Sequence, residues 1–252
     1  MTDTLLELLG AVPGALVCFV GAGGKKSSLY QLARVFDGRV GITATAHIEP
    51  FPRRYAQDAV VTDAPDLVDR VCAAAEHSRV VAFAKPCPNP GRLLGVTHDE
   101  LAAIRARAGF DLLLVKADGA RGRIVKAPAE HEPAVPPDAT TVVPVLSVRA
   151  LGQPLSERIA HRPERIAALC GIAPGTTLEP THLAQLLASP QGALQGSAGK
   201  RVVPVVNMVD DDGLAALARD IAREALARTD RFDRVVLAAM NRPQPLVDVV
   251  TR

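Results

Sequence analysis

Short apolar segments alternate with longer amphipathic segments along most of the chain. Apolar residues at helical spacing predict helices at Ser28–Phe36, Pro65–Glu76 and Asp212–Arg228, and Thr97 with Glu100 forms a capping box that opens another helix. This alternation predicts an α/β fold with a mainly parallel sheet. The predicted strands, which are rich in β-branched residues, are Ala15–Val20, Val40–Thr45, Val80–Phe83, Leu112–Ala117, Thr141–Leu146, Val202–Asn207 and Val235–Ala239.

Two stretches interrupt this alternation. Lys126–Pro137 contains four prolines, which excludes a regular helix or an inner strand and predicts a stiff loop. Ser189–Lys200 is rich in Gly, Ser and Gln and predicts a flexible loop. Between them, Arg162–Ala188 predicts two short helices, so we expect a helical insertion around residues 162–190 within a single domain of residues 1–252.

A glycine-rich turn follows the first predicted strand. Its residues are Gly21, Ala22, Gly23, Gly24, Lys25, Lys26, Ser27 and Ser28. Glycines between a buried strand and a helix permit close backbone approach, and backbone N–H groups, the helix N-terminus and a lysine then converge on an anion. These eight residues are therefore candidates for phosphate binding; the alternative is a strand–helix turn without a ligand.

The turn matches the P-loop pattern G-x-x-x-x-G-K-[ST] only in part. The first Gly of that pattern falls on Phe19, and Lys26 occupies the Ser/Thr position, whose hydroxyl helps to hold Mg²⁺ in P-loop NTPases. Three outcomes stay open at this point. Ser27 reaches the metal, Lys26 neutralises the phosphate in place of the metal, or hydrolysis is lost while binding remains.

Two later strands also end in candidate ligand residues. Leu112–Ala117 is followed by Asp118, where a P-loop protein places a second group that organises the metal; the alternative is a turn Asp before Gly119. Asn207-Met-Val-Asp210 is similar to the N-K-x-D element that reads guanine, with Met208 in the lysine position. Asn207 and Asp210 are therefore candidate nucleotide-binding residues.

Composition and charge narrow the class of protein. Of the 252 residues, 48% are hydrophobic, but only 3% are aromatic and none is Trp, so Ala, Val, Leu and Ile must build the core. A net charge of +2 without a basic block argues against nucleic-acid binding.

The four cysteines form no C-x-x-C pair and predict free thiols rather than a zinc site. No leader or membrane span is recognised, so we expect a cytoplasmic protein.

One long string carries a family resemblance. Residues 116–136 read K-A-D-G-A-R-G-R-I-V-K-A-P-A-E-H-E-P-A-V-P, and this resembles the signature of the YqeC family, selenium-dependent hydroxylase accessory or selenium cofactor biosynthesis proteins. Thr43-Ala-Thr-Ala-His-Ile48, Arg162-Pro-Glu164 and the glycine-rich turn also resemble family features. The resemblance implies a P-loop-type, three-layer α/β/α fold and a role in maturing molybdenum hydroxylases that carry a labile selenium.

The chain departs from the family pattern at several positions. Lys26 replaces a Thr, Lys116 replaces a Glu, and Ala44 and Ala46 interrupt a run of Thr. The added positive charge is compatible with holding an anionic ligand without a metal, and equally with a divergent member that has lost turnover.

The resemblance also directs attention to the loop after Lys126. Lys126, Glu130, His131 and Glu132 bring an ammonium, an imidazole and two carboxylates within seven residues. His131 is a candidate for proton transfer near neutral pH. The sequence therefore predicts a substrate or metal site near Asp118, with Asp118, Lys126, His131 and Glu132 as catalytic candidates; the alternative is a Pro-rich surface loop with solvated charges.

The glycine-rich turn predicts the nucleotide, and the resemblance implies the second ligand and the protein partner. We expect ATP or GTP with Mg²⁺ held by Ser27 and Asp118, together with a molybdopterin-type or selenium-containing ligand. The expected protein partner is a molybdenum hydroxylase apoprotein or a selenium-pathway protein, with neither nucleic acid nor membrane involved. An ATP- or GTP-dependent hydrolase, a phosphotransferase and a non-hydrolysing carrier or chaperone are the alternatives that the sequence leaves open.

Overall fold

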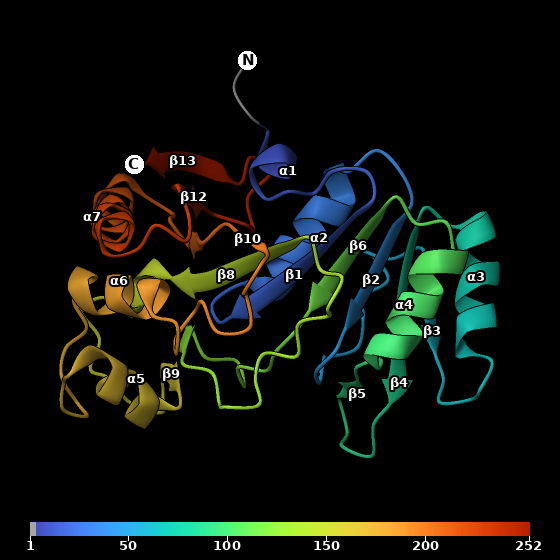
Figure 1. The fold of residues 1–252 in the computed structure, drawn as a ribbon, viewed down its shortest axis with the longest axis horizontal. Coiled ribbons are helices and arrows are strands. Elements are labelled where there is room, and N and C mark those ends of the chain that lie inside the picture. Colours follow the sequence, from blue (N-terminus) through green and yellow to red (C-terminus); the bar gives the residue numbers. More distant parts are fainter. Residues whose placement is uncertain (1–3) are drawn as a thin grey trace. The chain divides into compact units, whose positions relative to one another are not determined.

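The computed structural model describes residues 4–252 and has the expected α/β architecture (Figure 1). The helices are α1 (Leu5–Leu8), α2 (Lys25–Val35), α3 (Leu67–His77), α4 (His98–Arg107), α5 (Pro163–Cys170), α6 (Pro180–Ala188) and α7 (Asp212–Arg228), with a 3-10 turn at Val148–Ala150. The strands are β1 (Ala15–Gly21), β2 (Val40–Ala44), β3 (Asp58–Val61), β4 (Val80–Pro86), β5 (Leu93–Leu94), β6 (Leu112–Lys116), β7 (Val125–Lys126), β8 (Thr141–Ser147), β9 (Ala160–His161), β10 (Arg201–Val202), β11 (Val205–Asn207), β12 (Arg234–Ala238) and β13 (Leu246–Thr251). A mostly parallel sheet flanked by helices confirms the three-layer α/β/α class.

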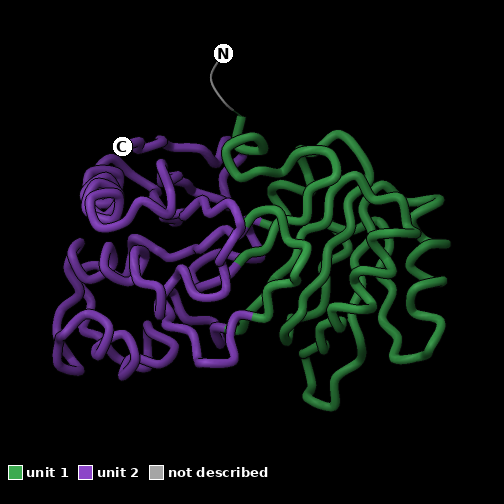
Figure 2. Tube along the Cα trace, viewed as in Figure 1, with its two compact units in different colours: residues 1–19, 29–119, 134–141 green, residues 20–28, 120–133, 142–252 purple. Residues whose placement is uncertain are grey.

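The chain forms two compact units, drawn in different colours in Figure 2. Unit 1 takes in the chain up to Phe19, then Leu29–Gly119 and Ala134–Thr141. Unit 2 comprises Val20–Ser28, Ala120–Pro133 and Val142–Arg252. The glycine-rich turn and the loop after Lys126 therefore both belong to unit 2.

Unit 1 is built on parallel strands in the order β1-β6-β2-β4-β3. β1 and β2 both pair with β6, so that Ala15 and Val40 lie in register with Leu112 from opposite sides. Every residue of β2 and β6 is buried, as expected for strands covered on both faces. The continuous apolar runs of the sequence thus correspond to the inner strands of this unit.

Unit 2 contains strands in the order β13-β12-β11-β8, in which only β13 runs antiparallel. The small residues of α7, including Ala218, Ala222 and Ala225, are buried in the same core cluster as Val206 and Leu237 of the strands. Small side chains permit close packing of this helix against the sheet. A separate parallel pair, β7 with β9, lies apart from the main strand order.

Most predicted elements are confirmed, with three informative differences. The predicted strand Val202–Asn207 is divided into β10 and β11, because Pro204 has no N–H to continue the ladder. Helix α2 begins at Lys25 rather than at Ser28, so both lysines lie in its first turn. β3 and β13 were not predicted, because β3 is mostly exposed, β13 is half-exposed, and neither has the continuous apolar run of the inner strands.

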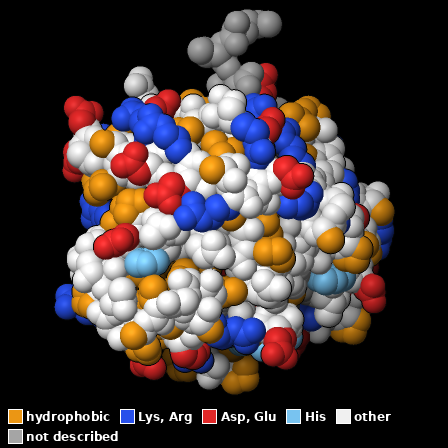
Figure 3. All heavy atoms as spheres, turned by 60° about the vertical axis from the view of Figure 1, so that its left-hand side comes forward, with side chains coloured by type: hydrophobic (Ala, Val, Ile, Leu, Met, Phe, Trp, Pro, Cys, Tyr) orange, Lys and Arg blue, Asp and Glu red, His pale blue; other side chains and the backbone are white. Residues whose placement is uncertain are grey.

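The insertion around residues 162–190 contains α5 and α6, as predicted. Ser189–Lys200 forms successive turns, with Leu194 and Ser197 buried. Acidic and basic side chains are interspersed on the face drawn in Figure 3, in keeping with the small net charge. Among the described residues, no helix has the length and apolar character needed to cross a membrane.

Candidate functional site

The glycines of the turn between β1 and α2 are required by their backbone geometry. Gly21, Gly23 and Gly24 have φ of +88°, +79° and +135°, which side-chain-bearing residues rarely adopt. A Cβ on Gly23 would lie 2.6 Å from the carbonyl oxygen of Ile124, and one on Gly24 would lie 1.9 Å from Nδ2 of Asn207. The glycines therefore allow other parts of unit 2 to approach the turn closely.

The first turn of α2 positions two lysines and two serines differently. Lys25 is buried, and its ammonium group donates to the carbonyl oxygen of Gly21. The hydroxyl of Ser28 is also buried and donates to the carbonyl oxygen of Gly24 at 3.0 Å. Lys26 and Ser27 are half-buried. Because Ser28 is committed to the backbone, Ser27 is the better hydroxyl candidate for a metal on this turn.

Asn207, at the end of β11, holds the glycine-rich turn from the other side. Its Nδ2 donates to the carbonyl oxygen of Gly23 at 2.8 Å, and its Oδ1 accepts from the backbone N–H of Met240 at 3.0 Å. An Asn amide has two N–H groups and two acceptor lone pairs. These two hydrogen bonds therefore use one N–H group and one lone pair, and leave one N–H group and one lone pair for other partners. The buried amide therefore anchors the turn.

The other residues of the Asn207–Asp210 element are also engaged within unit 2. Met208 adopts a left-handed backbone with φ of +64°, and its sulfur accepts from the hydroxyl of Ser147 at 3.0 Å. The carboxylate of Asp210 accepts from Arg149 at 2.6 Å and lies 3.8 Å from Nε of Arg242. These arginines are more than half exposed, so a ligand could displace such surface pairs at small cost.

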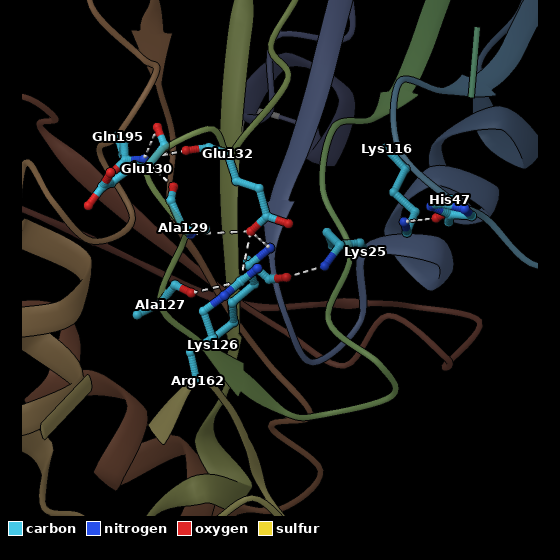
Figure 4. A network of polar contacts seen from close by, with 11 residues as sticks. Lys25, His47, Lys116, Lys126, Ala127, Ala129, Glu130, Glu132, Arg162 and Gln195 are labelled. Atoms are coloured by element: carbon cyan, nitrogen blue, oxygen red, sulfur yellow. Dashed lines mark hydrogen bonds and ion pairs between the residues drawn. The ribbon is translucent and has the colours of Figure 1, made fainter. Parts of the chain in front are cut away.

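The loop after Lys126 is held by one partly buried carboxylate, that of Glu132 (Figure 4). Oε2 of Glu132 lies 2.7 Å from the buried ammonium of Lys126 and 2.8 Å from the guanidinium of Arg162. It also accepts from the backbone N–H of Ala129 at 3.3 Å. Burial opposes ionisation of this carboxyl group, but Lys126 and then Arg162 outweigh it and lower the pKa of Glu132 to about 2.

Gln195 fixes the tip of the same loop, a role that the sequence analysis did not detect. Its amide donates to the carbonyl oxygen of Ala129 at 2.7 Å and to that of Glu132. Glu130 and His131, which lie between these anchors, are exposed. The structure therefore separates the predicted catalytic set: Lys126 and Glu132 are paired with each other, whereas His131 faces solvent.

His161 is a second residue that the sequence analysis missed. It lies in β9, in register with Lys126 of the parallel strand β7. Burial, followed by the charges of Arg162 and Lys126, lowers the pKa of His161 to about 4. The imidazole is therefore neutral at pH 7. The available signal was its place directly before Arg162-Pro-Glu164, one of the stretches that resembles family features.

The remaining predicted site residues belong to unit 1. Asp118 is buried after β6, and the ammonium of Lys116 donates to the carbonyl oxygen of His47 at 2.5 Å. The hydroxyls of Thr43 and Thr45 donate to the carbonyl oxygens of Phe83 and Ala134, each at 2.6 Å. These contacts give Lys116 and the threonines structural roles within this unit.

The described side chains form no preassembled metal site. Within residues 4–252 there is no group of three or more His, Cys, Asp or Glu side chains that could enclose an ion. The described cysteines are free thiols, as predicted. Any Mg²⁺ on Ser27 or Asp118 would therefore take most of its ligands from phosphate oxygens and water, which is the usual coordination for this ion.

Comparisons with known proteins agree with the resemblance in the sequence. The model of the family described as YqeC protein matches residues 17–164, which include the glycine-rich turn, the loop after Lys126, and Arg162. A relative from Escherichia coli (strain K12), named "Uncharacterized protein YqeC", is 32% identical over 187 residues. The match covers 71% of this chain and 70% of the relative. The chain belongs to the YqeC family.

Proposed function

We propose that this protein binds a nucleotide, or another phosphorylated ligand such as a molybdopterin, at the glycine-rich turn. It would act as an accessory protein in selenium cofactor biosynthesis, during maturation of selenium-dependent molybdenum hydroxylases. One observation carries the binding proposal: three glycines with positive φ lead directly into α2 at Lys25, and Asn207 holds the turn in place.

The physical argument rests on the first turn of α2. The first N–H groups of a helix have no intrahelical acceptor, and the helix dipole adds partial positive charge at the same end. Lys25 places an ammonium on the carbonyl oxygen of Gly21, within the turn itself. A phosphate would offer that ammonium stronger, charge-assisted hydrogen bonds than a backbone carbonyl does.

The other candidates take roles that follow from their surroundings. Ser27 would contribute to Mg²⁺ on the turn, while Asn207 and Asp210 would contact the base. Lys126 and Glu132 position the loop through their ion pair. Exposed His131 would transfer protons on a second ligand, the molybdopterin-type or selenium-containing compound. A hydrolase or a phosphotransferase would use this full set.

A second candidate function is a non-hydrolysing carrier that delivers a nucleotide or cofactor to the apo-hydroxylase. Lys26 favours it, because an ammonium stands in the first turn of α2 where P-loop enzymes present the metal-binding hydroxyl. Charge neutralisation by Lys26 would let the phosphates bind without Mg²⁺. The two candidates therefore differ in whether binding requires the metal.

Calorimetry with ATP, GTP and a non-hydrolysable GTP analogue, with and without Mg²⁺, tests both candidates. Wild type is compared with Lys25→Ala and with Lys85→Ala, a control lysine of unit 1 that pairs with Glu100. Mg²⁺-dependent binding lost only in Lys25→Ala supports an NTPase, and metal-independent binding lost in the same variant supports the carrier. Absence of binding to all three, or equal binding in Lys25→Ala, overturns nucleotide binding at the turn.

The selenium role needs a separate measurement. A molybdenum hydroxylase is purified after expression with and without this protein, and its selenium and molybdenum are quantified by mass spectrometry. A selenium-to-molybdenum ratio that falls without the protein supports the accessory role. An unchanged ratio contradicts it, whatever the calorimetry shows.

A further inference from the structure

The tip of the loop after Lys126 is a tight turn that closes between Ala129 and Glu132. The backbone N–H of Glu132 donates to the carbonyl oxygen of Ala129 at 3.0 Å. The carboxylate of Glu132 accepts from the backbone N–H of Ala129 at 3.3 Å. The two residues between them, Glu130 and His131, are exposed. The conformation of this turn therefore decides where their side chains stand.

The side-chain amide of Gln195 holds the backbone of the same turn (Figure 4). Its Nε2 donates to the carbonyl oxygen of Ala129 at 2.7 Å and to that of Glu132. The carbonyl oxygen of Glu130 lies 3.4 Å from the same nitrogen. An amide nitrogen carries two N–H groups, so the two nearer carbonyls use both of them. Carbonyls from the two ends of the turn thus converge on a single donor.

Gln195 stands on a segment that is itself fixed to unit 2. Leu194, directly before it, is buried in the core cluster that also contains residues of α6 and α7. Gly196, directly after it, has φ of +74°, and a Cβ there would lie 3.2 Å from Cγ of Pro133. The segment therefore passes close to the residue that follows the turn. These contacts make Ser189–Lys200 a support for the turn instead of the flexible loop that its composition predicted.

We propose that Gln195 is a positioning residue for His131, and that it keeps the turn in the conformation in which His131 meets the second ligand. This inference rests on the proposed function, in which His131 transfers protons on that ligand. Proton transfer requires the two heavy atoms to approach within about 2.6–3.2 Å, so a small displacement of the turn takes the imidazole out of reach. Gln195 lies outside residues 17–164, which match the family model.

The amide and the ion pairs act on different parts of the turn. Lys126 and Arg162 hold the side-chain carboxylate of Glu132. Gln195 instead holds the backbone carbonyls on either side of the exposed tip. Gln195→Glu is therefore a sharp test, because it keeps the length of the side chain but replaces the N–H donors with oxygens that repel the carbonyls. Gln195→Ala removes the same donors without adding a charge.

NMR of the full chain tests the anchoring without any ligand, after urea unfolding has shown that each variant is folded. The imidazole resonance of His131 is identified by its absence from His131→Ala, and solvent exchange of the Glu132 N–H reports on the turn. We expect both Gln195 variants to move the imidazole resonance and to speed this exchange about tenfold. Gln191→Ala, at an exposed glutamine of the same segment, should change neither. An unmoved His131 resonance in both Gln195 variants overturns the proposal.

The selenium-to-molybdenum ratio of a molybdenum hydroxylase separates this inference from the proposed function. A ratio that falls at least threefold with Gln195→Ala and with His131→Ala, but not with Gln191→Ala, supports the positioning role. A ratio that falls with His131→Ala and is kept with Gln195→Ala overturns it, because His131 then works without its anchor. A ratio that His131→Ala leaves unchanged contradicts proton transfer by His131 in the proposed function. The NMR comparison then decides by itself whether Gln195 positions His131.

Discussion

The side-chain amide of Asn207 donates a hydrogen bond of 2.8 Å to the backbone carbonyl of Gly23. This bond joins the end of β11 to the glycine-rich turn across 184 positions of sequence. The same amide accepts from the N–H of Met240, after β12. One buried side chain thus joins three separate segments of unit 2 and holds the turn in one conformation.

Asn207→Ala should destabilise unit 2 and weaken ligand binding together. The substitution leaves the carbonyl of Gly23 and the N–H of Met240 without this partner, and each unsatisfied buried group costs about 1–3 kcal/mol. Urea unfolding gives the loss of stability, and nucleotide calorimetry gives the loss of affinity. The control is Asn241→Ala, at the exposed residue that directly follows Met240, and it should change neither the stability nor the affinity. Full stability of Asn207→Ala would contradict an anchoring role.

Gly24→Ala should disrupt the turn more than a comparable glycine substitution elsewhere. Gly24 has φ of +135°, and an added Cβ would lie 1.9 Å from Nδ2 of Asn207. Gly199→Ala is the matched control in the same unit, since φ is +70° there but nothing lies within 4 Å of the added atom. A left-handed backbone alone costs about 1–2 kcal/mol. Thermal unfolding should show a larger loss for Gly24→Ala, and equal losses would remove the steric argument.

The sequence predicted the fold better than the site because the two depend on different kinds of information. Inner strands such as β6 are buried on both faces, so their apolar runs are visible in the sequence alone. The strand β13 is half-exposed and lies at the edge of the described strand order, paired with β12, and no local pattern marks it. Its place depends on antiparallel pairing with β12, which precedes it directly in the chain.

The site shows the same division. The glycines and Lys25 form a local motif, and their place between β1 and α2 is confirmed. Gln195 and His161 contact the loop after Lys126 from distant positions, and neither belongs to the string that carries the family resemblance. Lys126 and Glu132 were predicted as catalytic, but a sequence does not show that two such groups neutralise each other in an ion pair.

The ion pair of Glu132 should make stability depend on acid pH. The pKa of this carboxyl is lowered from 4.5 to about 2 in the folded chain, through Lys126 and Arg162 acting against burial. The stabilisation is therefore complete above about pH 4.5 and is lost as the pH falls towards 2. In Glu132→Gln this dependence is absent, so the stability difference from wild type should shrink across that window. Urea unfolding at several pH values checks this, and a constant difference would contradict it.

His161 should produce a second, separate dependence at higher pH. Its folded pKa of about 4 lies below the ordinary value of 6.5, because burial and neighbouring cations disfavour the imidazolium. As the pH is lowered, the imidazole of the unfolded chain is protonated at a higher pH than that of the folded chain. The free energy of unfolding therefore falls as the pH is lowered from 6.5 to 4. His161→Gln should flatten this part of the profile, and the exposed His131→Gln serves as its control. An identical slope in wild type and His161→Gln would contradict the assignment.

Tyr30 offers the last prediction, in unit 1. Its ring stacks on that of Tyr55 with 4.2 Å between centroids, and no described residue hydrogen-bonds its buried hydroxyl. Burial, and then the nearby Tyr55, raise the pKa of Tyr30 from 10 to about 12. The contribution of the neutral phenol to folding stability is therefore complete below pH 10 and is lost as the pH rises through 12. Tyr30→Phe should keep the stack and match or exceed wild-type stability by up to about 1 kcal/mol, because it removes an unsatisfied polar group. The chain has two Tyr and no Trp, so in Tyr55→Phe an alkaline absorbance titration follows the Tyr30 phenol alone. Ionisation near pH 10 in that variant, while it remains folded, would show that the hydroxyl reaches water and would contradict the buried stack.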